Sequence, residues 1–492
     1  RPLASSPRDE LVRAYFIWSA VGVPYLVDFA PGLLAWARSS SLPGVAAMTD
    51  WIVRKTFFAH FVGGETVEAT LPLLDSLAQR HTGVILNHSC EVDSHHRAAE
   101  ARATVHAALI TSLLHSIDVA SSSSSSAAEV GSVSIAIKLS GLLSSPAVFE
   151  RVSAAIVPRE HFSLPPAPAP PAGVGGGSLS VPLAALDAAD ASALKELWEA
   201  LRGVARHSRK KNVRLLIDAE YSWYQPAIDA LYEALACEFN SLSDQQASQP
   251  LLFNTYQTYL RRTPSHLAAS LERARRGGYA LGVKLVRGAY VDIENAAWRT
   301  HVVQPPPAGH HRDEKAVAKE ERGSPVWASK ALTDACYDAC AARLIDELAK
   351  DSADGAPRLA VVFASHNVAS ARAVVAQMQT CGLASSPSSQ PEDQETESHV
   401  VVLPHVRGRL AFAQLYGMAD ELTRLLLHTF AAPSPAGISD VSATPLVHKY
   451  VPWGALDDVL PYLLRRAQEN SSLSAGARRE RQLIWSEARW RM

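Results

Sequence analysis

The stretch ALGVKLVRGAY at residues 280–290 is an apolar run that stops at polar residues. Short apolar runs of this kind are typical of strands buried on both faces. Lys284 stands inside the run, and burying its ammonium group is costly unless the group meets an anion. Four residues follow the apolar part: Arg287, Gly288, Ala289 and Tyr290. The pattern predicts a buried strand that brings charged groups to its C-terminal end.

Seven further apolar runs share this pattern. They lie at 83–88, 132–139, 213–218, 251–256, 358–364, 399–403 and 446–451. Segments long enough for helices lie between them, among others 191–207, 264–277, 334–350 and 367–380. Eight buried strands that alternate with helices predict an α/β fold, a parallel (βα)8 barrel of the TIM type.

A doubly wound sheet is the structural alternative. It would need a phosphate-binding glycine turn between an early strand and a helix. The obvious candidate, GVGGG at 173–177, follows a proline-rich run and precedes no clear helix start. We therefore interpret it as a flexible linker and keep the barrel.

The chain divides into an N-terminal region and the barrel. Residues 1–80 carry helix-like patterns without a convincing strand, so we expect a helical region there and the barrel over 81–492. Low-complexity or polar segments predict insertions in the barrel near 119–130, 163–180, 304–325 and 385–398.

Composition argues against several classes of protein. The 492 residues carry a formal net charge of −2, so nothing indicates nucleic-acid binding. Five cysteines without a CxxC motif give no disulfide framework and favour a reducing compartment. Cysteines and histidines do not have the spacing of metal ligands, so we expect no metal site.

An apolar stretch of 14 uncharged residues lies between Arg13 and Asp28. It is too short to span a bilayer and is interrupted by Gly22 and Pro24. The stretch predicts a buried helix, with contact to a membrane surface as the alternative. Because the chain begins at Arg1, we expect any targeting peptide to have been removed.

Polar side chains stand in or directly after most of the predicted strands. They include Lys138, Asp218, Gln257, Lys284, Arg287, His366, Asn367 and Tyr450. Active sites of such barrels lie at the C-terminal ends of the strands, so we expect these side chains to surround one pocket. The cations outnumber the acids, which suits a phosphate-bearing ligand together with a small carboxylate substrate. Gly288 would let the main chain approach such a ligand closely.

The segment after the last strand, YVPWGALDDVLPYLLRRAQENSS at 450–472, predicts a helix from Ala455 on. Four of its residues share one helical face: Tyr462, Arg465, Arg466 and Glu469. Two guanidinium groups on one face can bind a carboxylate at two points. A solvated helix face is the alternative for an isolated arginine pair.

Several blocks of the sequence resemble the signature of the proline dehydrogenase family. In the family's order they are IAIKLSG, LLIDAEYSWYQPAID, FNTYQTYLRR, GVKLVRGAY, ASHN, AQLYGMAD and YVPWGALDDVLPYLLRRAQENSS. The blocks fall within residues 130–485 and resemble the mitochondrial eukaryotic form of this flavin-dependent enzyme most. The resemblance implies a distorted barrel that holds FAD, with the last helix across its mouth. It also implies a mitochondrial location, in the matrix or at the inner membrane.

The resemblance assigns two groups of site residues. The substrate group is Lys138, Asp218, Ala289, Tyr290, Leu415, Tyr450, Tyr462, Arg465 and Arg466, with the arginine pair on the proline carboxylate. The FAD group is Gln257, Lys284, Arg287, Gly288, Ala289, His366, Asn367, Glu469 and Ser472, with Lys284 beside the reactive edge of the isoalloxazine.

The implied activity is oxidation of L-proline to Δ1-pyrroline-5-carboxylate, by hydride transfer from C5 to N5 of FAD. The electrons would then pass to a quinone or another membrane acceptor, and the enzyme would associate with the inner-membrane surface. The alternatives are a hydroxyproline dehydrogenase on the same scaffold and a flavin-binding protein without turnover. The resemblance implies a smaller residue than Tyr450 in hydroxyproline dehydrogenases, so Tyr450 favours proline. The fused bacterial enzymes of this family are a further alternative. The chain is too short for them, and its net charge is too close to zero.

Overall fold

The computed structural model describes most of the chain. The described residues are 8–89, 99–123, 132–143, 145–157, 186–243, 249–302, 324–354, 357–386, 399–430, 444–472, 481–482, 484–487 and 489. The predicted insertions fall mostly outside these ranges. Of the segment near 119–130, residues 119–122 belong to a helix.

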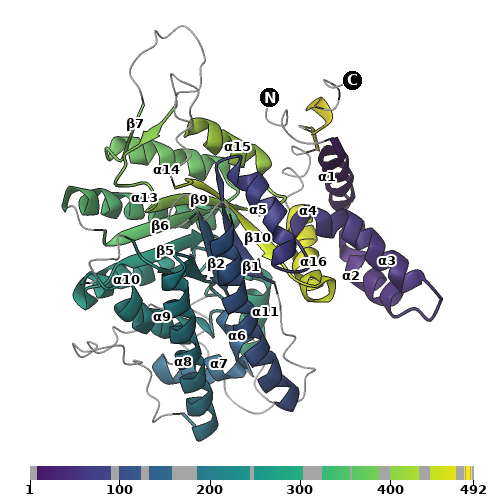
Figure 1. Cartoon of the computed structure of the whole chain (residues 1–492), viewed down its shortest axis with the longest axis horizontal. Helices are drawn as coiled ribbons and strands as arrows, with labels where there is room; N and C mark the ends of the chain where they lie inside the picture. The colour runs from purple at the N-terminus through teal and green to yellow at the C-terminus, as the bar shows by residue number, and fades with distance from the viewer. Residues whose placement is uncertain are drawn as a thin grey trace, which may run out of the picture.

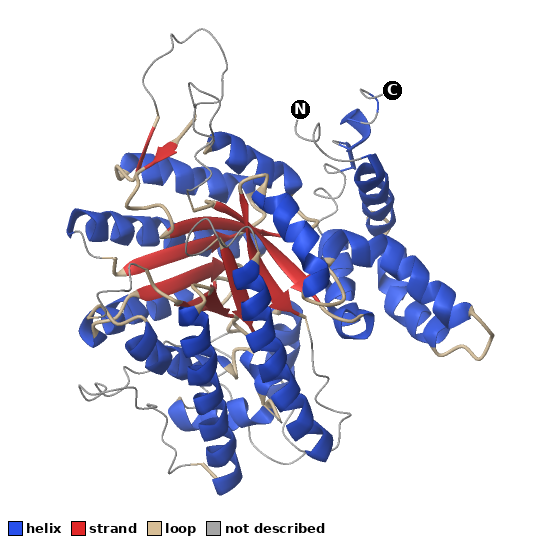
Figure 2. Cartoon of the chain, viewed as in Figure 1, coloured by secondary structure: helices blue, strands red, loops and turns tan. Residues whose placement is uncertain are grey.

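Eight parallel strands close into a barrel at the centre of the molecule, and helices surround it (Figures 1 and 2). The strands are β1 (Thr82–His88), β2 (Val133–Ile137), β3 (Arg214–Ile217), β4 (Leu252–Gln257), β5 (Leu281–Val286), β6 (Leu359–Ala364), β9 (Leu410–Leu415) and β10 (Val447–Trp453). Their order around the barrel is β1-β10-β9-β6-β5-β4-β3-β2. The predicted (βα)8 barrel is confirmed.

Helices surround the barrel, and most of them bury an apolar face against the strands. Within the described residues they are α6 (Ala99–Ser122), α7 (Ala147–Ile156), α8 (Ala188–Lys210), α9 (Gln225–Phe239), α10 (Thr263–Gly277), α11 (Val291–Val302), α13 (Lys330–Asp354), α14 (Val368–Thr380), α15 (Asp420–Thr429) and α16 (Leu456–Ser472). The short turn η4 (Leu139–Leu142) follows β2. The four helices predicted between the strands are all present.

The barrel interior is filled by small and apolar side chains. A cluster distinct from the helix-facing core contains Ile85, Ala136, Leu216, Phe253, Ala360, Val362, Ala411 and Ala413, one or two from each of six strands. Because side chains alternate along a strand, this cluster identifies the inward-facing positions. Residues two further along each strand lie nearer the C-terminal end of the barrel, where the site is expected.

The seventh barrel strand is not the predicted one. Residues 399–403 were expected to form it, but Val401–Val402 forms β8, which pairs antiparallel with β7 (Ala384–Ser385) outside the barrel. The barrel strand is β9, with the sequence LAFAQL. Alanine has low strand propensity, whereas HVVVL is rich in β-branched residues, so local propensity favoured the wrong run. The small alanines fit the crowded barrel interior, which a propensity argument does not detect.

The N-terminal region is helical, as predicted. It contains α1 (Arg8–Val21), α2 (Pro24–Arg38), α3 (Val45–Val53), the π-helical turn η1 (Arg54–Phe58), α4 (Ala59–Phe61), the turn η2 (Glu68–Thr70) and α5 (Leu71–Ala78). Helices α2 and α3 project from the barrel in Figure 1.

The apolar stretch between Arg13 and Asp28 is shared between α1 and α2. Ile17 and Val21 are buried in a cluster with residues of α16, whereas Phe16 is 71% and Tyr25 77% exposed. The stretch is therefore partly a packed helix and partly an apolar surface. Among the described residues, no helix is long and apolar enough to cross a membrane.

Candidate active site at the C-terminal end of the barrel

Three side chains from three strands meet inside the C-terminal end of the barrel. Asp218 directly follows β3, Lys284 lies in β5, and Tyr450 lies in β10. The Lys284 ammonium donates to Oδ1 of Asp218, and the Tyr450 hydroxyl donates to Oδ2 at 2.7 Å. The Lys284 Nζ also lies 5.3 Å from the centre of the Tyr450 ring. Asp218 is therefore the anion that the sequence predicted for the buried Lys284.

Burial sets the protonation state of Tyr450. Burial, reinforced by the Asp218 carboxylate, raises the pKa of Tyr450 well above its usual value. Tyr450 therefore stays a neutral phenol at any physiological pH and can only donate to Asp218. Asp218 is the one acceptor that the ammonium and the phenol share. Its removal would leave Lys284 buried without a counter-charge.

Helix α16 packs against both the N-terminal helices and the segment after β9. Its Val459, Tyr462 and Leu463 share an apolar cluster with Phe61 of α4 and with Met418. Arg38 of α2 hydrogen-bonds Asp457 at the start of α16. These contacts fix the helix that carries the arginine pair.

The inner face of α16 holds buried polar atoms that have no partner. Arg466 is 7% exposed, hydrogen-bonds Glu469, and lies 5.2 Å from the centre of the Tyr462 ring. Its Nε atom and the Tyr462 hydroxyl are buried, and the structure gives neither a hydrogen-bond partner. Leaving such groups unpaired costs about 1–3 kcal/mol each. They are available to a ligand. Arg465 is half-buried one residue away.

The residues after β5 form a constrained loop. Gly288 has φ +117°, and a Cβ there would lie 1.8 Å from the Tyr259 ring, so only glycine fits. Ala289 is exposed, and the Tyr290 ring packs 4.9 Å from the Tyr221 ring. The loop thus presents bare main chain at the end of the barrel.

Arg287 is held by protein groups on every side. Its Nε donates to Asp334 at 2.5 Å, Nη1 to Ser365 at 2.5 Å and Nη2 to Ser370 at 2.8 Å. Its guanidinium carbon lies 4.2 Å from the centre of the Tyr337 ring. This geometry fixes the direction in which its remaining N–H groups point.

His366 and Asn367 follow β6, and both make structural contacts. Nε2 of His366 accepts from the main-chain N of Leu415 at 3.1 Å, so this nitrogen carries no proton. Burial, with the nearby Lys449 and Arg466 charges, lowers the pKa of His366 to about 3. Asn367 caps α14 by accepting from Ala369 N at 2.9 Å.

The remaining predicted residues lie at the same end. Lys138 follows β2 and is half-buried, and Leu415 ends β9 and is half-buried. Gln257 ends β4 and donates to the main-chain O of Glu220 at 2.8 Å. Ser472 is the last residue of α16, and its side chain lies outside the described atoms.

Two buried charges here were given no role by sequence reasoning. Glu220 accepts from Ser140 N at 2.9 Å, which ties the end of β3 to the turn after Lys138, and burial raises the pKa of this carboxyl. Lys449 donates to Asp420 at 2.7 Å and to the main-chain O of Met418 at 2.8 Å. The signal for Lys449 was available, because it too stands in an apolar run.

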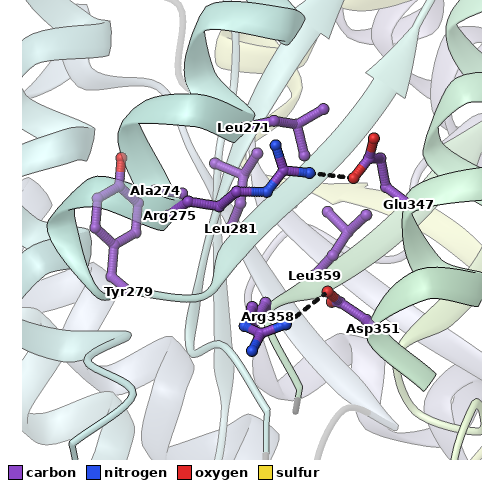
Figure 3. A pocket seen from close by; sticks show the side chains of 9 residues that line it. All are labelled: Leu271, Ala274, Arg275, Tyr279, Leu281, Glu347, Asp351, Arg358 and Leu359. Carbon is purple, nitrogen blue, oxygen red and sulfur yellow. Dashed lines mark hydrogen bonds and ion pairs between the residues drawn. The ribbon is translucent and has the colours of Figure 1, made fainter. Parts of the chain in front are cut away.

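A cavity lies at the opposite end of the barrel, beside the first residues of β5 and β6 (Figure 3). Arg275 pairs there with Glu347, and Arg358 lies 3.9 Å from Asp351. Its charged side chains are therefore directed at one another. No residue of either predicted group lines this cavity.

Known proteins are similar to this chain in sequence. The family model described as Proline dehydrogenase matches residues 71–307 and 308–479. Hydroxyproline dehydrogenase of Rattus norvegicus is 30% identical over 483 residues, which cover 98% of this chain and 91% of the rat protein. Proline dehydrogenase 1, mitochondrial, of Homo sapiens is 33% identical over 284 residues, 58% of this chain and 37% of that protein.

A similar fold occurs in solved structures. Proline utilization A from Bdellovibrio bacteriovorus, inactivated by N-propargylglycine, superposes with a TM-score of 0.56 over 94% of this chain. Sequence identity is 17%, so this likeness concerns the fold alone. The chain spans 36% of the length of that protein.

Proposed function

The chain belongs to the proline dehydrogenase family, and from that premise we propose that it oxidises L-proline to Δ1-pyrroline-5-carboxylate with FAD. Family membership makes it an oxidoreductase that acts on proline-like substrates. The observation that supports L-proline and FAD is that two groups of polar side chains lie at one end of the barrel. There the Asp218, Lys284 and Tyr450 cluster lies at the same end as Tyr462 and Arg466, whose buried polar atoms lack partners.

The residues at this end fit a flavin. The main chain at Gly288 and Ala289 is exposed, Arg287 has N–H groups beyond the three that donate to protein acceptors, and cations dominate the rim. We propose that FAD is held by Gln257, Lys284, Arg287, Gly288, Ala289, His366, Asn367, Glu469 and Ser472. Bound FAD would supply the hydride acceptor that no side chain provides.

The chain's own residues would bind and orient the substrate. Arg465 and Arg466 would grip the carboxylate, which fixes the ring in one orientation. Lys138, Asp218, Ala289, Tyr290, Leu415, Tyr450 and Tyr462 would enclose the ring. The positive charge of Lys138 and of the arginine pair would favour the neutral ring amine, the form from which a hydride can leave.

4-Hydroxyproline is the second candidate substrate. Hydroxyproline dehydrogenases from four mammals match 98% of this chain, whereas the proline dehydrogenase matches cover 58–59%. Against this stands Tyr450, whose ring occupies the interior next to Asp218. We therefore keep proline as the primary substrate and test both.

We also propose that electrons leave to a membrane quinone and that the N-terminal helices dock on the inner-membrane surface. Resemblance to relatives named as mitochondrial supports this location. Tyr25, Phe29 and Trp36 of α2 are 62–77% exposed and recur on one helical face, and Trp51 of α3 is 60% exposed. Aromatic side chains of this kind are favoured at the membrane interface. Sedimentation with liposomes tests this, because Trp36→Glu should reduce the bound fraction.

Within this scheme, 1–80 would be a docking region and 81–492 the catalytic barrel. Substrate binding is tested by Arg466→Ala and Arg465→Ala, with the exposed Arg372→Ala on α14 as the matched control. Both test variants should raise KM for proline strongly while FAD stays bound, and the control should change neither. Loss of FAD with unchanged KM would contradict the assignment of the pair to the carboxylate.

A further inference from the structure

Asn87 is a polar residue at the inner face of β1 that neither predicted group contains. Ile85 of the same strand belongs to the interior cluster, so Asn87, two residues on, faces the same way. It stands opposite Ala136 of β2 and Pro452 of β10 in the strand register. Asn87 therefore lies at the C-terminal end of the barrel interior, between the strands that carry Lys138 and Tyr450.

The Asn87 side chain is buried and not satisfied. The residue is 3% exposed, and its Oδ1 has no hydrogen-bond partner in the structure. The same holds for Oγ of Ser89, which directly follows β1 and is 2% exposed. Since an unpaired buried polar atom costs about 1–3 kcal/mol, two at one strand end indicate a polar ligand there.

The order of the strands tells which ligand Asn87 faces. In the closed ring of eight, β1 lies four strands from β5 in either direction, and β5 carries Lys284 and leads to Arg287. Its two neighbours, β2 and β10, lead to Lys138 and carry Tyr450, which belong to the substrate group. Asn87 thus stands between two strands that supply substrate-group residues, on the opposite side of the ring from β5, which leads to members of both groups.

Besides its carboxylate, which is assigned to the arginine pair of α16, proline offers a neutral amide only its ring amine. Its ring carbons form no hydrogen bonds. A hydroxyl on the ring is both donor and acceptor and would satisfy the Asn87 amide. Binding sites that hydrogen-bond a substrate hydroxyl discriminate strongly against the analogue that lacks it.

We infer that Asn87 is a specificity-determining residue that hydrogen-bonds a hydroxyl on the substrate ring. This rests on the proposed function. The site then contains two opposed determinants on adjacent strands: the bulk of Tyr450, which favours the bare ring, and the Asn87 amide, which favours the hydroxylated ring. The ratio of kcat/KM for 4-hydroxy-L-proline and L-proline reports their balance.

The test measures that ratio in the full-length FAD-loaded protein and in two variants. Asn87→Leu removes both polar atoms at similar size, and it should lower the ratio about tenfold by reducing kcat/KM for hydroxyproline alone. Asn87→Asp keeps an acceptor in the same shape and should retain most of the ratio. Because both substrates are measured on one protein preparation, a general loss of folded enzyme cancels.

An equal loss for both substrates in Asn87→Leu would overturn the inference, because it would place the amide on a group that both share. An unchanged ratio would overturn it as well. If the wild-type protein oxidised neither amino acid, the proposed function would fail instead. Should Asn87→Leu not fold, the ratio in Asn87→Asp and in Asn87→Ser decides, with Asn87→Ser expected to lower it.

Discussion

The two ends of the barrel bury the same kinds of charged side chain for different purposes. At the N-terminal end, Arg409 donates to the main-chain O of Leu359 and to Asp351, each at 3.0 Å. At the C-terminal end, Asp218 gathers a lysine and a tyrosine from two other strands. Arg409, directly before β9, thus joins β9 to β6 and to α13, whereas the Asp218 cluster lies at the end that holds the buried, unpartnered Arg466 Nε and Tyr462 hydroxyl.

This difference teaches how to separate structural from functional charge in one fold. Arg409, whose partners are a main-chain carbonyl of β6 and a carboxylate of α13, stabilises the barrel. A cluster beside the unpartnered Arg466 Nε and Tyr462 Oη keeps capacity for a ligand. The comparison therefore predicts that substitutions at the C-terminal end impair turnover, and that those at the N-terminal end impair stability.

The largest effect is expected for Asp218→Ala. It leaves the Lys284 ammonium buried without a counter-charge and removes the acceptor of the Tyr450 hydroxyl. The side chains proposed to enclose the substrate ring would then no longer be held in place. We expect kcat/KM for proline to fall about 100-fold or more. Steady-state kinetics normalised to bound FAD measure this, with the exposed Asp338→Ala as control. Near-normal turnover would remove the cluster from the mechanism.

At the other end, Asp351→Ala should lower the stability of the protein without reducing its turnover. Arg409 is 6% exposed and would be left buried without its carboxylate. The free energy of unfolding should fall by about 3–5 kcal/mol. Denaturant titration measures this, and kcat/KM per bound FAD should stay near the wild-type value. A selective loss of turnover in folded protein would break the contrast between the two ends.

His60, which lies beneath the segment after β9, should make stability depend on pH. Burial, with the nearby Arg13 charge, lowers the pKa of His60 to about 4 from 6.5, against the opposing effect of Asp420. A lowered pKa means that the stabilisation is complete above pH 6.5 and is lost as the pH falls towards 4. The loss amounts to about 3 kcal/mol.

Unfolding curves between pH 7 and pH 4 for the wild type and His60→Gln test this expectation. The variant lacks the titrating group, so its stability should fall less steeply over this range. Parallel curves for the two proteins would show that His60 does not contribute.

The smallest effect is expected for Tyr450→Phe. It removes one neutral hydroxyl from Asp218 and keeps the ring, so the loss is that of a single hydrogen bond. We expect kcat/KM for proline to fall about 3- to 10-fold. A fall as large as that of Asp218→Ala would mean that the hydroxyl, not the lysine, is the essential partner.

Much of this architecture could be predicted from the sequence. Apolar runs bounded by turns located seven of the eight barrel strands, and the lysine inside one of them predicted a buried anion. The missed strand β9 is rich in alanine, and only the closed barrel interior explains why small residues are favoured there. Pairing of Asp218 with Lys284 joins residues 66 positions apart, which no local pattern specifies.

Other features of the site needed three-dimensional information. Asn87 stands in the run GVILNH, where a polar residue near a strand end was visible, but its lack of a partner was not. Conversely, His366 and Asn367 stand at a strand end as functional residues do, yet the contacts that the structure shows for them hold Leu415 and cap α14. Their proposed contact with FAD stays a prediction.

The most direct test of the account is an anaerobic titration of the flavin absorbance with L-proline, in the wild type and in both acid-to-alanine variants. The account predicts that proline bleaches the flavin in the wild type and in Asp351→Ala, but far less in Asp218→Ala. The account would be contradicted if proline did not reduce the flavin of the wild-type protein. It would also be contradicted if proline reduced the flavin of Asp218→Ala as readily as that of the wild type.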